Sequence, residues 1–300
     1  MSEERPTIRP VTLARLVETT NICENGPRTV EDIEAALDVT HRRARETTLE
    51  TLRIGLLGSK HQEGEDETYE STYIGDRFLN AVRAEEWSKV SDVLATQSPH
   101  YSAFLEALDN VAPASLEVVL EELESLEEFT NYSYNQTSVE VVGDWAERLG
   151  TVQRNSFTGS YYSVERNGVP SNFPFALLAV YDDLEETAGV DLRQRYLSIP
   201  LLREHFCERH GCPRSVFDEA LRRLAQRNVG RLELSGAPMD TGAKEAQLGI
   251  KEIKLGSETG LVTTDQSTER VMAGIEQFGK QYYYLAVYDR DLIFTREKET

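Results

Sequence analysis

The chain has 300 residues but only three cysteines, three methionines and two tryptophans. Three cysteines cannot build a disulfide framework in a chain of this length. No apolar run of about 18 residues occurs, which argues against a membrane-spanning helix. The opening stretch MSEERPTIRP also lacks the apolar segment of a secretory signal. We therefore expect a cytoplasmic protein that makes no contact with a membrane.

Basic residues are scarce as well, and one kind is nearly missing. The chain carries 52 acidic residues against 32 basic ones, a formal net charge of -20, and seven of the bases are lysines against 25 arginines. This balance resembles the archaeal-like composition of extreme halophiles, where acidity keeps cytosolic proteins in solution. In molar salt the Debye length is roughly 3 Å, so only local charge patches would affect binding. The alternative is an acidic protein that binds other proteins.

Signatures of catalysis are missing too. The chain has no G-x-S-x-G elbow, no P-loop, no H-E-x-x-H motif and no Rossmann glycine pattern. Asp240 with Glu252 and Lys254 is similar to the Asp…Glu-x-Lys signature of restriction-type nucleases, which hold Mg²⁺ on the carboxylates. However, the residues after Asp240 do not form the strand pattern that such a fold needs. We expect no enzyme and no cofactor.

A second cluster has the residue types of a metal site. Its members follow the spacing H-x-C-x2-H-x-C, which matches no common zinc module: His205, Cys207, His210 and Cys212. Two residues apart on a helix, His205 and Cys207 point to different faces, so one ion could not readily take all four. We interpret Cys207 as a small core residue and expect no metal.

Three helices followed by a strand pair are predicted near the N-terminus. Apolar residues at helical spacing indicate the first helix over Thr12–Ile22. Thr29, followed three residues later by an aspartate, is close to a capping box and predicts the start of the second. Thr40 is a typical N-cap for the third, which runs to about Ile54. Gly55 ends it, and two strands then flank the polar run SKHQEGEDET.

This order resembles the winged helix-turn-helix superfamily over about Thr12 to Ile74. Ala44, four residues after Thr40, matches the position where that superfamily packs its third helix against its second. The run GLL that starts at Gly55 matches the usual entry to the wing. The alternative is a generic helical bundle in which Gly55 is only a C-cap.

The pattern of helices, an arginine-bearing helix, a glycine and a hairpin returns further along the chain. We therefore expect a mainly α protein with small β-wings, an α+β chain of two or three winged helix-turn-helix modules joined by helical connectors. The expected domains are 1–95, an N-terminal module with connector helices, 96–170, a middle module, and 171–300, a C-terminal module with a β-rich tail. In the middle module TVQRN and YYSVE are predicted as short strands.

The C-terminal resemblance covers about Ser198 to Leu255, with GIKEIKL as the return strand. Ser198 and Pro200 are typical of a helix start, and Gly230 is typical of a helix end. The tail is predicted to contain a helix over TERVMAGIEQF. It then continues with YYYLAVYDRDLIF as a strand, a turn at Asp289-Arg290 and another strand.

The third helix of the N-terminal module is the strongest local cationic feature. From Thr40 to Arg53 its arginines outnumber its glutamates by four to two, a local charge of +2 with histidine neutral. The superfamily usually presents the N-terminal end of this helix to the major groove. Arginine can pair bidentately with guanine or fix phosphates. The residues expected to contact DNA are Thr40, His41, Arg42, Arg43 and Arg45. The alternative is a solvated helix face whose arginines pair with neighbouring acids.

The C-terminal module repeats the feature. From Arg203 to Arg231 seven arginines face four acids, a local charge of +3. Arg214 is at the start of the corresponding helix, and Arg222 and Arg223 lie further along it. These three complete the predicted contacts to DNA.

The resemblance implies a protein that binds double-stranded DNA, as a transcriptional regulator or as the DNA-contacting subunit of a larger complex. The alternative is a non-catalytic scaffold, because winged helices also serve as docking modules in chromosome-maintenance complexes, and a defence-complex subunit would fit equally. Six glutamates and no base between Glu117 and Glu128, and the tyrosines at 282–284, favour protein partners or a homodimer.

Overall fold

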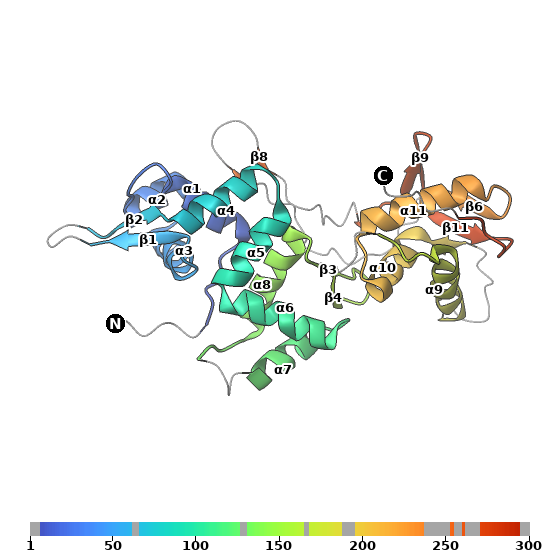
Figure 1. Ribbon diagram of the computed structural model, residues 1–300, viewed down its shortest axis with the longest axis horizontal. Helices are drawn as coiled ribbons and strands as arrows, with labels where there is room; N and C mark the ends of the chain where they lie inside the picture. The colour runs from blue at the N-terminus through green and yellow to red at the C-terminus, as the bar shows by residue number, and fades with distance from the viewer. Residues whose placement is uncertain are drawn as a thin grey trace. The chain divides into compact units, whose positions relative to one another are not determined.

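The computed structural model describes residues 7–61, 66–126, 131–164, 168–187, 196–236, 253–254, 260–261 and 271–294 (Figure 1). The described residues form mainly helices, with small antiparallel strand pairs and one three-stranded sheet. The expected mainly α chain with small β elements is therefore confirmed. Within these ranges no helix has both the length and the apolarity to cross a bilayer.

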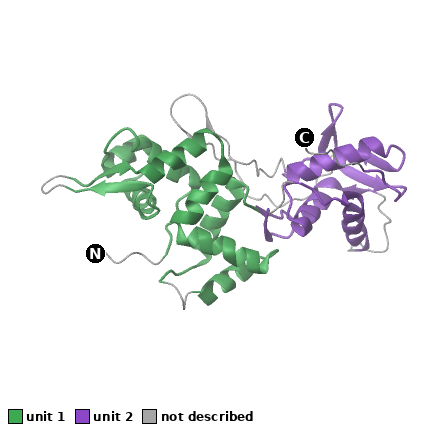
Figure 2. Cartoon of the chain, in the orientation of Figure 1, with its two compact units in different colours: residues 1–152, 250–265 green, residues 153–249, 266–300 purple. Residues whose placement is uncertain are grey.

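The chain divides into two units (Figure 2). Unit 1 comprises 1–152 and 250–265, and unit 2 comprises 153–249 and 266–300. The expected boundaries at 95 and 170 differ from the boundary at 152, and the division into three modules stays a prediction.

Unit 1 begins with three helices and a strand pair. Their bounds are α1 Leu13–Ile22, α2 Val30–Leu37, α3 His41–Arg53, β1 Leu57–Lys60 and β2 Thr68–Ser71. Each helix starts behind a threonine, Thr12, Thr29 or Thr40, whose hydroxyl accepts the backbone N–H three residues later. Such caps satisfy amide groups that a helix end otherwise leaves unpaired. The capping box predicted at Thr29 is present.

A short antiparallel ladder closes this part of unit 1. β1 pairs with β2 from Leu57 opposite Ser71 to Lys60 opposite Thr68. On its other side β2 forms a bridge between Tyr69 and Arg28, in the segment that joins α1 to α2. Ala44 is fully buried in the cluster that α2, α3 and the ladder share, so the small residue does lie where two helices meet. At the end of α3, Gly55 has φ +79°, a conformation that favours glycine.

The rest of unit 1 is helical. It consists of α4 Tyr73–Arg83, α5 Trp87–Gln97, α6 Pro99–Val111, α7 Leu116–Leu126 and α8 Gln136–Leu149. The α8 side chain Trp145 is fully buried and donates Nε1–H to the carbonyl oxygen of Val11, at 2.9 Å. α8 is thereby joined to the segment just before α1.

One strand prediction was wrong. Ile253–Lys254, inside GIKEIKL, forms β7, which pairs with β8 Gly260–Leu261 and contacts α1 of unit 1. The segment was expected to be the return strand of the C-terminal module. Strand propensity alone does not predict which strand a segment pairs with, because strands are stabilised by the neighbours they pack against.

Unit 2 combines a hairpin, three helices and a small sheet. Its elements are β3 Val152–Arg154, β4 Tyr161–Ser163, α9 Phe173–Thr187, β5 Leu197–Ser198, α10 Ile199–His210, α11 Arg214–Arg227, β6 Leu232–Ser235, β9 Ile275–Gln277, β10 Lys280–Tyr282 and β11 Tyr284–Val287. The return strand is β11, which lies between β5 and β6 and is antiparallel to both. β3 and β4 lie where TVQRN and YYSVE predicted strands.

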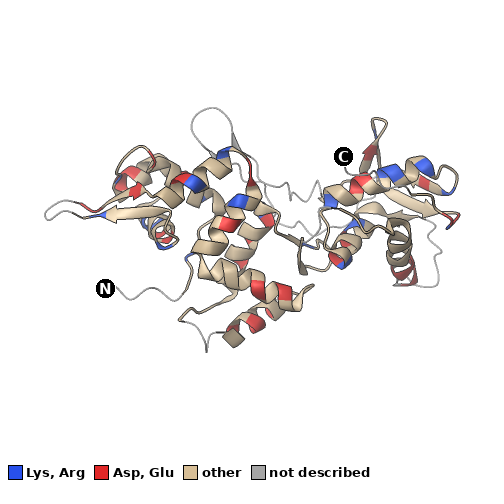
Figure 3. Cartoon of the chain, viewed as in Figure 1, with Lys and Arg blue, Asp and Glu red and all other residues tan. Residues whose placement is uncertain are grey.

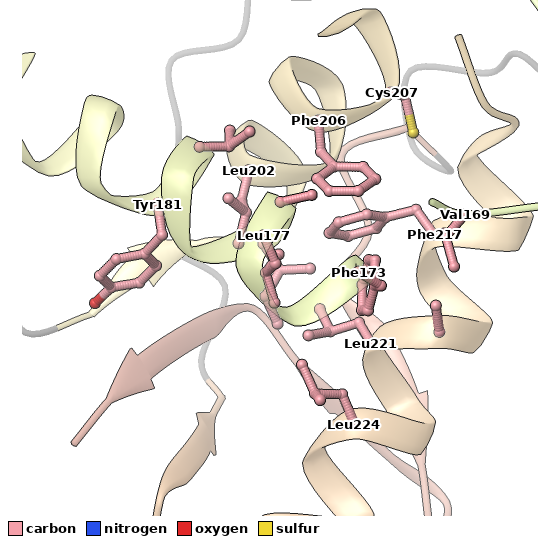
Figure 4. Packing of buried hydrophobic residues seen from close by; sticks show 14 of the residues in the cluster. Val169, Phe173, Leu177, Tyr181, Leu202, Phe206, Cys207, Phe217, Leu221 and Leu224 are labelled. Atoms are coloured by element: carbon pink, nitrogen blue, oxygen red, sulfur yellow. The ribbon is translucent and has the colours of Figure 1, made fainter. Parts of the chain in front are cut away.

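The core of unit 2 contains three phenylalanine rings packed among aliphatic side chains (Figure 4). Phe173 of α9, Phe206 of α10 and Phe217 of α11 are fully buried, with ring centroids 5.1–6.1 Å apart. Tilted and edge-to-face ring pairs of this kind add to the free energy of burial. The core fixes α11 against α10 and so determines which side of α11 remains exposed.

The tail differs from its prediction in two places. Ile275–Gln277, expected in a helix, is β9 and pairs with β10 around Phe278-Gly279. A two-residue turn with positive φ at both positions favours the hairpin over the helical periodicity. The second strand expected after Asp289 does not form, because Leu292 and Phe294 instead pack irregularly against the core.

Candidate nucleic-acid interface

The first turn of α3 presents three basic side chains and no acid. His41, Arg42 and Arg43 follow the cap Thr40, whose hydroxyl accepts the N–H of Arg43 at 3.4 Å. The Arg42 side chain is 89% exposed. The N-terminal end of a helix carries partial positive charge, and an acid-free first turn leaves that charge uncompensated by the helix itself. The turn can therefore attract an anion from solution.

Neighbouring acids partly neutralise these cations. Arg42 Nε donates to Glu46 at 3.1 Å, and Arg43 Nη1 lies 3.9 Å from the same carboxylate. His41 Nδ1 lies 2.9 Å from a Glu34 oxygen of α2. This pairing is what the alternative interpretation of the helix expected. Exposed pairs contribute only about 0–1 kcal/mol, and salt weakens them further, so a phosphate can displace them.

Arg43 and Arg45 of α3 are less strongly paired with acids than Arg42 is. Arg43 Nη2 donates to the carbonyl oxygen of Pro10 at 3.1 Å, which orients the side chain without neutralising it. Arg45 is exposed and forms no salt bridge within the described residues. With Arg42, these side chains form the available cationic surface of α3.

The C-terminal half of α3 has a different role. Glu50 is fully buried and accepts hydrogen bonds from Arg53 Nε at 3.0 Å and from the backbone N–H of Arg9 at 3.2 Å. Arg53 Nη1 lies 3.2 Å from Nδ1 of His100 on α6. The network fixes α3 against the rest of unit 1. Arg53 therefore adds nothing to the exposed charge, although it counted toward the local +2.

Arg214 is built into the interior of unit 2. Its Nε and Nη2 donate to the two oxygens of Glu204, at 2.5 and 2.7 Å, and Nη2 also donates to the carbonyl oxygen of Arg154 at 2.7 Å. The two side chains are 11% and 0% exposed. Burial acts to lower the pKa of Arg214, but the hydrogen bonds and charge of Glu204 outweigh it and raise the pKa. The pair holds the start of α11 against α10.

Arg222 and Arg223 lie together on the exposed side of α11. Both pair with Glu219, and the Arg223 Nε–Glu219 distance is 2.8 Å. The three side chains share a net charge of +1, so the exposed charge of α11 is smaller than the +3 counted from Arg203 to Arg231 suggests. Along α11 the adjacent acids Asp218 and Glu219 lie between Arg214 and Arg222, and the charged positions that follow are basic (Figure 3).

Two further clusters from the sequence have residue types that bind metal ions. Cys207 and Cys212 are fully buried, with their Sγ atoms 3.9 Å apart, and burial raises the pKa of the Cys207 thiol. Metal ions bind the thiolate, so a raised pKa opposes coordination. No group of three or more His, Cys, Asp or Glu in these ranges is arranged for a metal ion. Asp240 and Glu252 of the nuclease-like pattern lie outside the described residues.

Comparison with protein-family models and with curated proteins finds no match for this chain.

Proposed function

We propose that the chain binds double-stranded DNA through the first turn of α3, as a transcriptional regulator or as the DNA-contacting subunit of a complex. The proposal includes the finer fold assignment, in which α1 to β2 form a winged helix-turn-helix. The bridge of Arg28 to β2 and the ladder of β1 with β2 support that assignment. In unit 2 a comparable order of a helix, a short strand, two helices and two paired strands is given by α9, β5, α10, α11, β6 and β11, with the β9–β10 hairpin inserted before β11.

The observation that carries the proposal is the acid-free first turn of α3. Arg42, Arg43 and Arg45 can reach phosphates or base edges, because Glu46, the carboxylate that pairs with Arg42 and Arg43, is only partly buried. The nearby acids of α2, Glu31 and Glu34, pair with His41. Arg222 and Arg223 would add a weaker second contact, and Arg214 is excluded from the proposal because Glu204 occupies it.

A protein-docking scaffold is the second candidate, and α7 favours it. Every charged position of α7 is acidic: Glu117, Glu121, Glu122 and Glu124 (Figure 3). Val118 is exposed among them. An acidic face repels phosphate but would suit a basic partner protein.

The test measures binding of a fluorescent duplex by anisotropy over a series of KCl concentrations up to the molar range. The variant Arg42→Glu with Arg45→Glu should lose binding. A matched control, Arg77→Glu with Lys89→Glu, makes the same change in net charge at exposed positions on α4 and α5 and should keep it. If the unmodified protein binds no duplex at any salt concentration, the proposal is wrong and the docking role stands.

A further inference from the structure

Unit 2 contains a groove that the DNA proposal does not use. It has a volume of about 600 Å³ and lies among the end of α11, strand β6 and the β9–β10 hairpin. That size is within the range of small-ligand pockets, roughly 300–1,000 Å³. Its described lining includes three aromatic side chains and three strongly polar ones, namely Phe278, Tyr282, Tyr288, Gln226, Glu233 and Gln277.

Phe278 occupies the rim at a position that local structure does not favour. It is the first residue of the two-residue turn between β9 and β10, with φ +54°, and Gly279 follows with φ +70°. Turns of this kind favour asparagine or glycine, and a bulky residue with positive φ is an outlier. The Phe278 side chain is also 84% exposed. Hairpin stability thus does not explain this ring, whereas contact with a molecule in the groove would.

Gln277 gives the second observation. Its residue is only 9% exposed, it lines the groove, and its Oε1 has no hydrogen-bond partner. A buried acceptor without a donor is unfavourable, and native proteins rarely leave one. A bound group that brings an N–H donor would satisfy it once the Gln277 side chain turns toward the groove.

Charge narrows the ligand class. Glu233 is the one charged residue in the described lining, and the Tyr288 hydroxyl donates to its Oε2 at 2.6 Å. A carboxylate accepts several hydrogen bonds, so Glu233 can accept further donors. Aromatic faces attract cations through their ring quadrupoles. Rings, a carboxylate and an unsatisfied acceptor together favour a cation with N–H donors.

We propose that this groove binds a flat organic cation carrying N–H donors. The cation comes either from a free amidine or guanidine, or from the guanidinium of an arginine side chain in a peptide. This inference is independent of DNA binding, because none of its residues belongs to α3.

The first experiment titrates the full chain with benzamidine and with benzamide, its neutral isostere, in a calorimeter at constant KCl. Both probes have the same shape, so their difference reports charge. We expect benzamidine to bind about tenfold more tightly. Equal affinities, or no saturable binding of benzamidine, would overturn the proposal. Agmatine and a blocked Gly-Arg-Gly peptide then separate the two sources, and the tighter ligand identifies the source.

Variants separate binding from folding. Phe278→Asn should weaken benzamidine binding about fivefold, while the thermal midpoint stays the same or rises because asparagine suits the turn. Glu233→Gln keeps an acceptor for Tyr288 and should weaken binding about tenfold through the lost charge. The control Phe175→Asn removes an exposed ring of α9 outside the groove lining and should leave binding unchanged. Unchanged binding in both Phe278→Asn and Glu233→Gln would overturn the proposal.

Discussion

α3 and α11 each carry arginine in the first turn, but the two helices use it differently. Arg42 of α3 is almost fully exposed and is paired with Glu46, whose side chain is only partly buried. Arg214 of α11 is buried against fully buried Glu204. The partner's burial decides the role, because a buried carboxylate needs a permanent counter-charge and an exposed one does not. Two similar stretches of sequence thus yield an exposed cationic surface on α3 and, in unit 2, the ion pair between Arg214 and Glu204 that joins α11 to α10.

The largest effect should come from breaking the Arg214–Glu204 ion pair. Arg214→Ala leaves Glu204 buried without its counter-charge and should lower the free energy of unfolding by about 3–5 kcal/mol. Urea unfolding followed by circular dichroism at constant KCl measures it. Arg214→Met with Glu204→Gln should recover part of the loss, since glutamine can still accept the N–H of Ser156. If Arg214→Ala has the same free energy of unfolding as the unmodified protein, the ion pair does not stabilise the fold.

Neutralising the exposed arginines of α3 should weaken DNA binding and leave the free energy of unfolding unchanged. Arg42→Gln with Arg45→Gln should weaken duplex binding about tenfold to a hundredfold and should reduce the slope of log K against log salt by about two. Anisotropy titrations at several KCl concentrations give both values. A weaker complex with an unchanged slope would mean that these side chains do not neutralise phosphates.

The exposed arginines of α11 should matter least for DNA. Arg222 and Arg223 share Glu219, so their replacement by glutamine changes the net charge of that cluster from +1 to -1. We expect duplex affinity to change by about threefold or less, which is the size of a weak exposed contact. The same anisotropy assay applies. A loss as large as that of the α3 variant would show that both units contribute equally.

Local signals in the sequence predicted α3 well. The caps at Thr29 and Thr40, the buried Ala44 and the helix-ending Gly55 all depend on residues within a few positions of each other. Such short-range patterns are visible without a fold. The same reasoning found the start of α10 from Ser198 and Pro200.

The roles of the arginines depended on distant segments and could not be read in the same way. Arg53 is held away from solvent by its contacts with Glu50 and with His100 of α6. Arg214 is held away from solvent by its ion pair with Glu204 of α10. An i,i+3 glutamate hinted at the first pair, but nothing local indicated its burial. Likewise β11 replaces the expected return strand, because register and pairing are settled by packing across the sheet. Net charge counts from sequence therefore overstated the exposed charge of both helices.

The smallest expected effect concerns the N-terminal ends of α2 and α11, only one of which has a side-chain cap. α2, which packs on α3, starts with a capping box, whereas α11 starts at Pro213 without a side-chain cap. The backbone N–H and then the hydroxyl of Thr29, hydrogen-bonded to Asp32, lower the pKa of that carboxyl below its ordinary value. A lowered folded-state pKa means that the cap stabilises α2 above the unfolded-state pKa, and that this contribution is lost as the pH falls through the folded-state value. Carbon-detected NMR titration of the side-chain carboxyls should show Asp32 titrating below the ordinary aspartate range. Titration at the ordinary value would mean that the box is open in solution, and that α3 is held in place by packing alone.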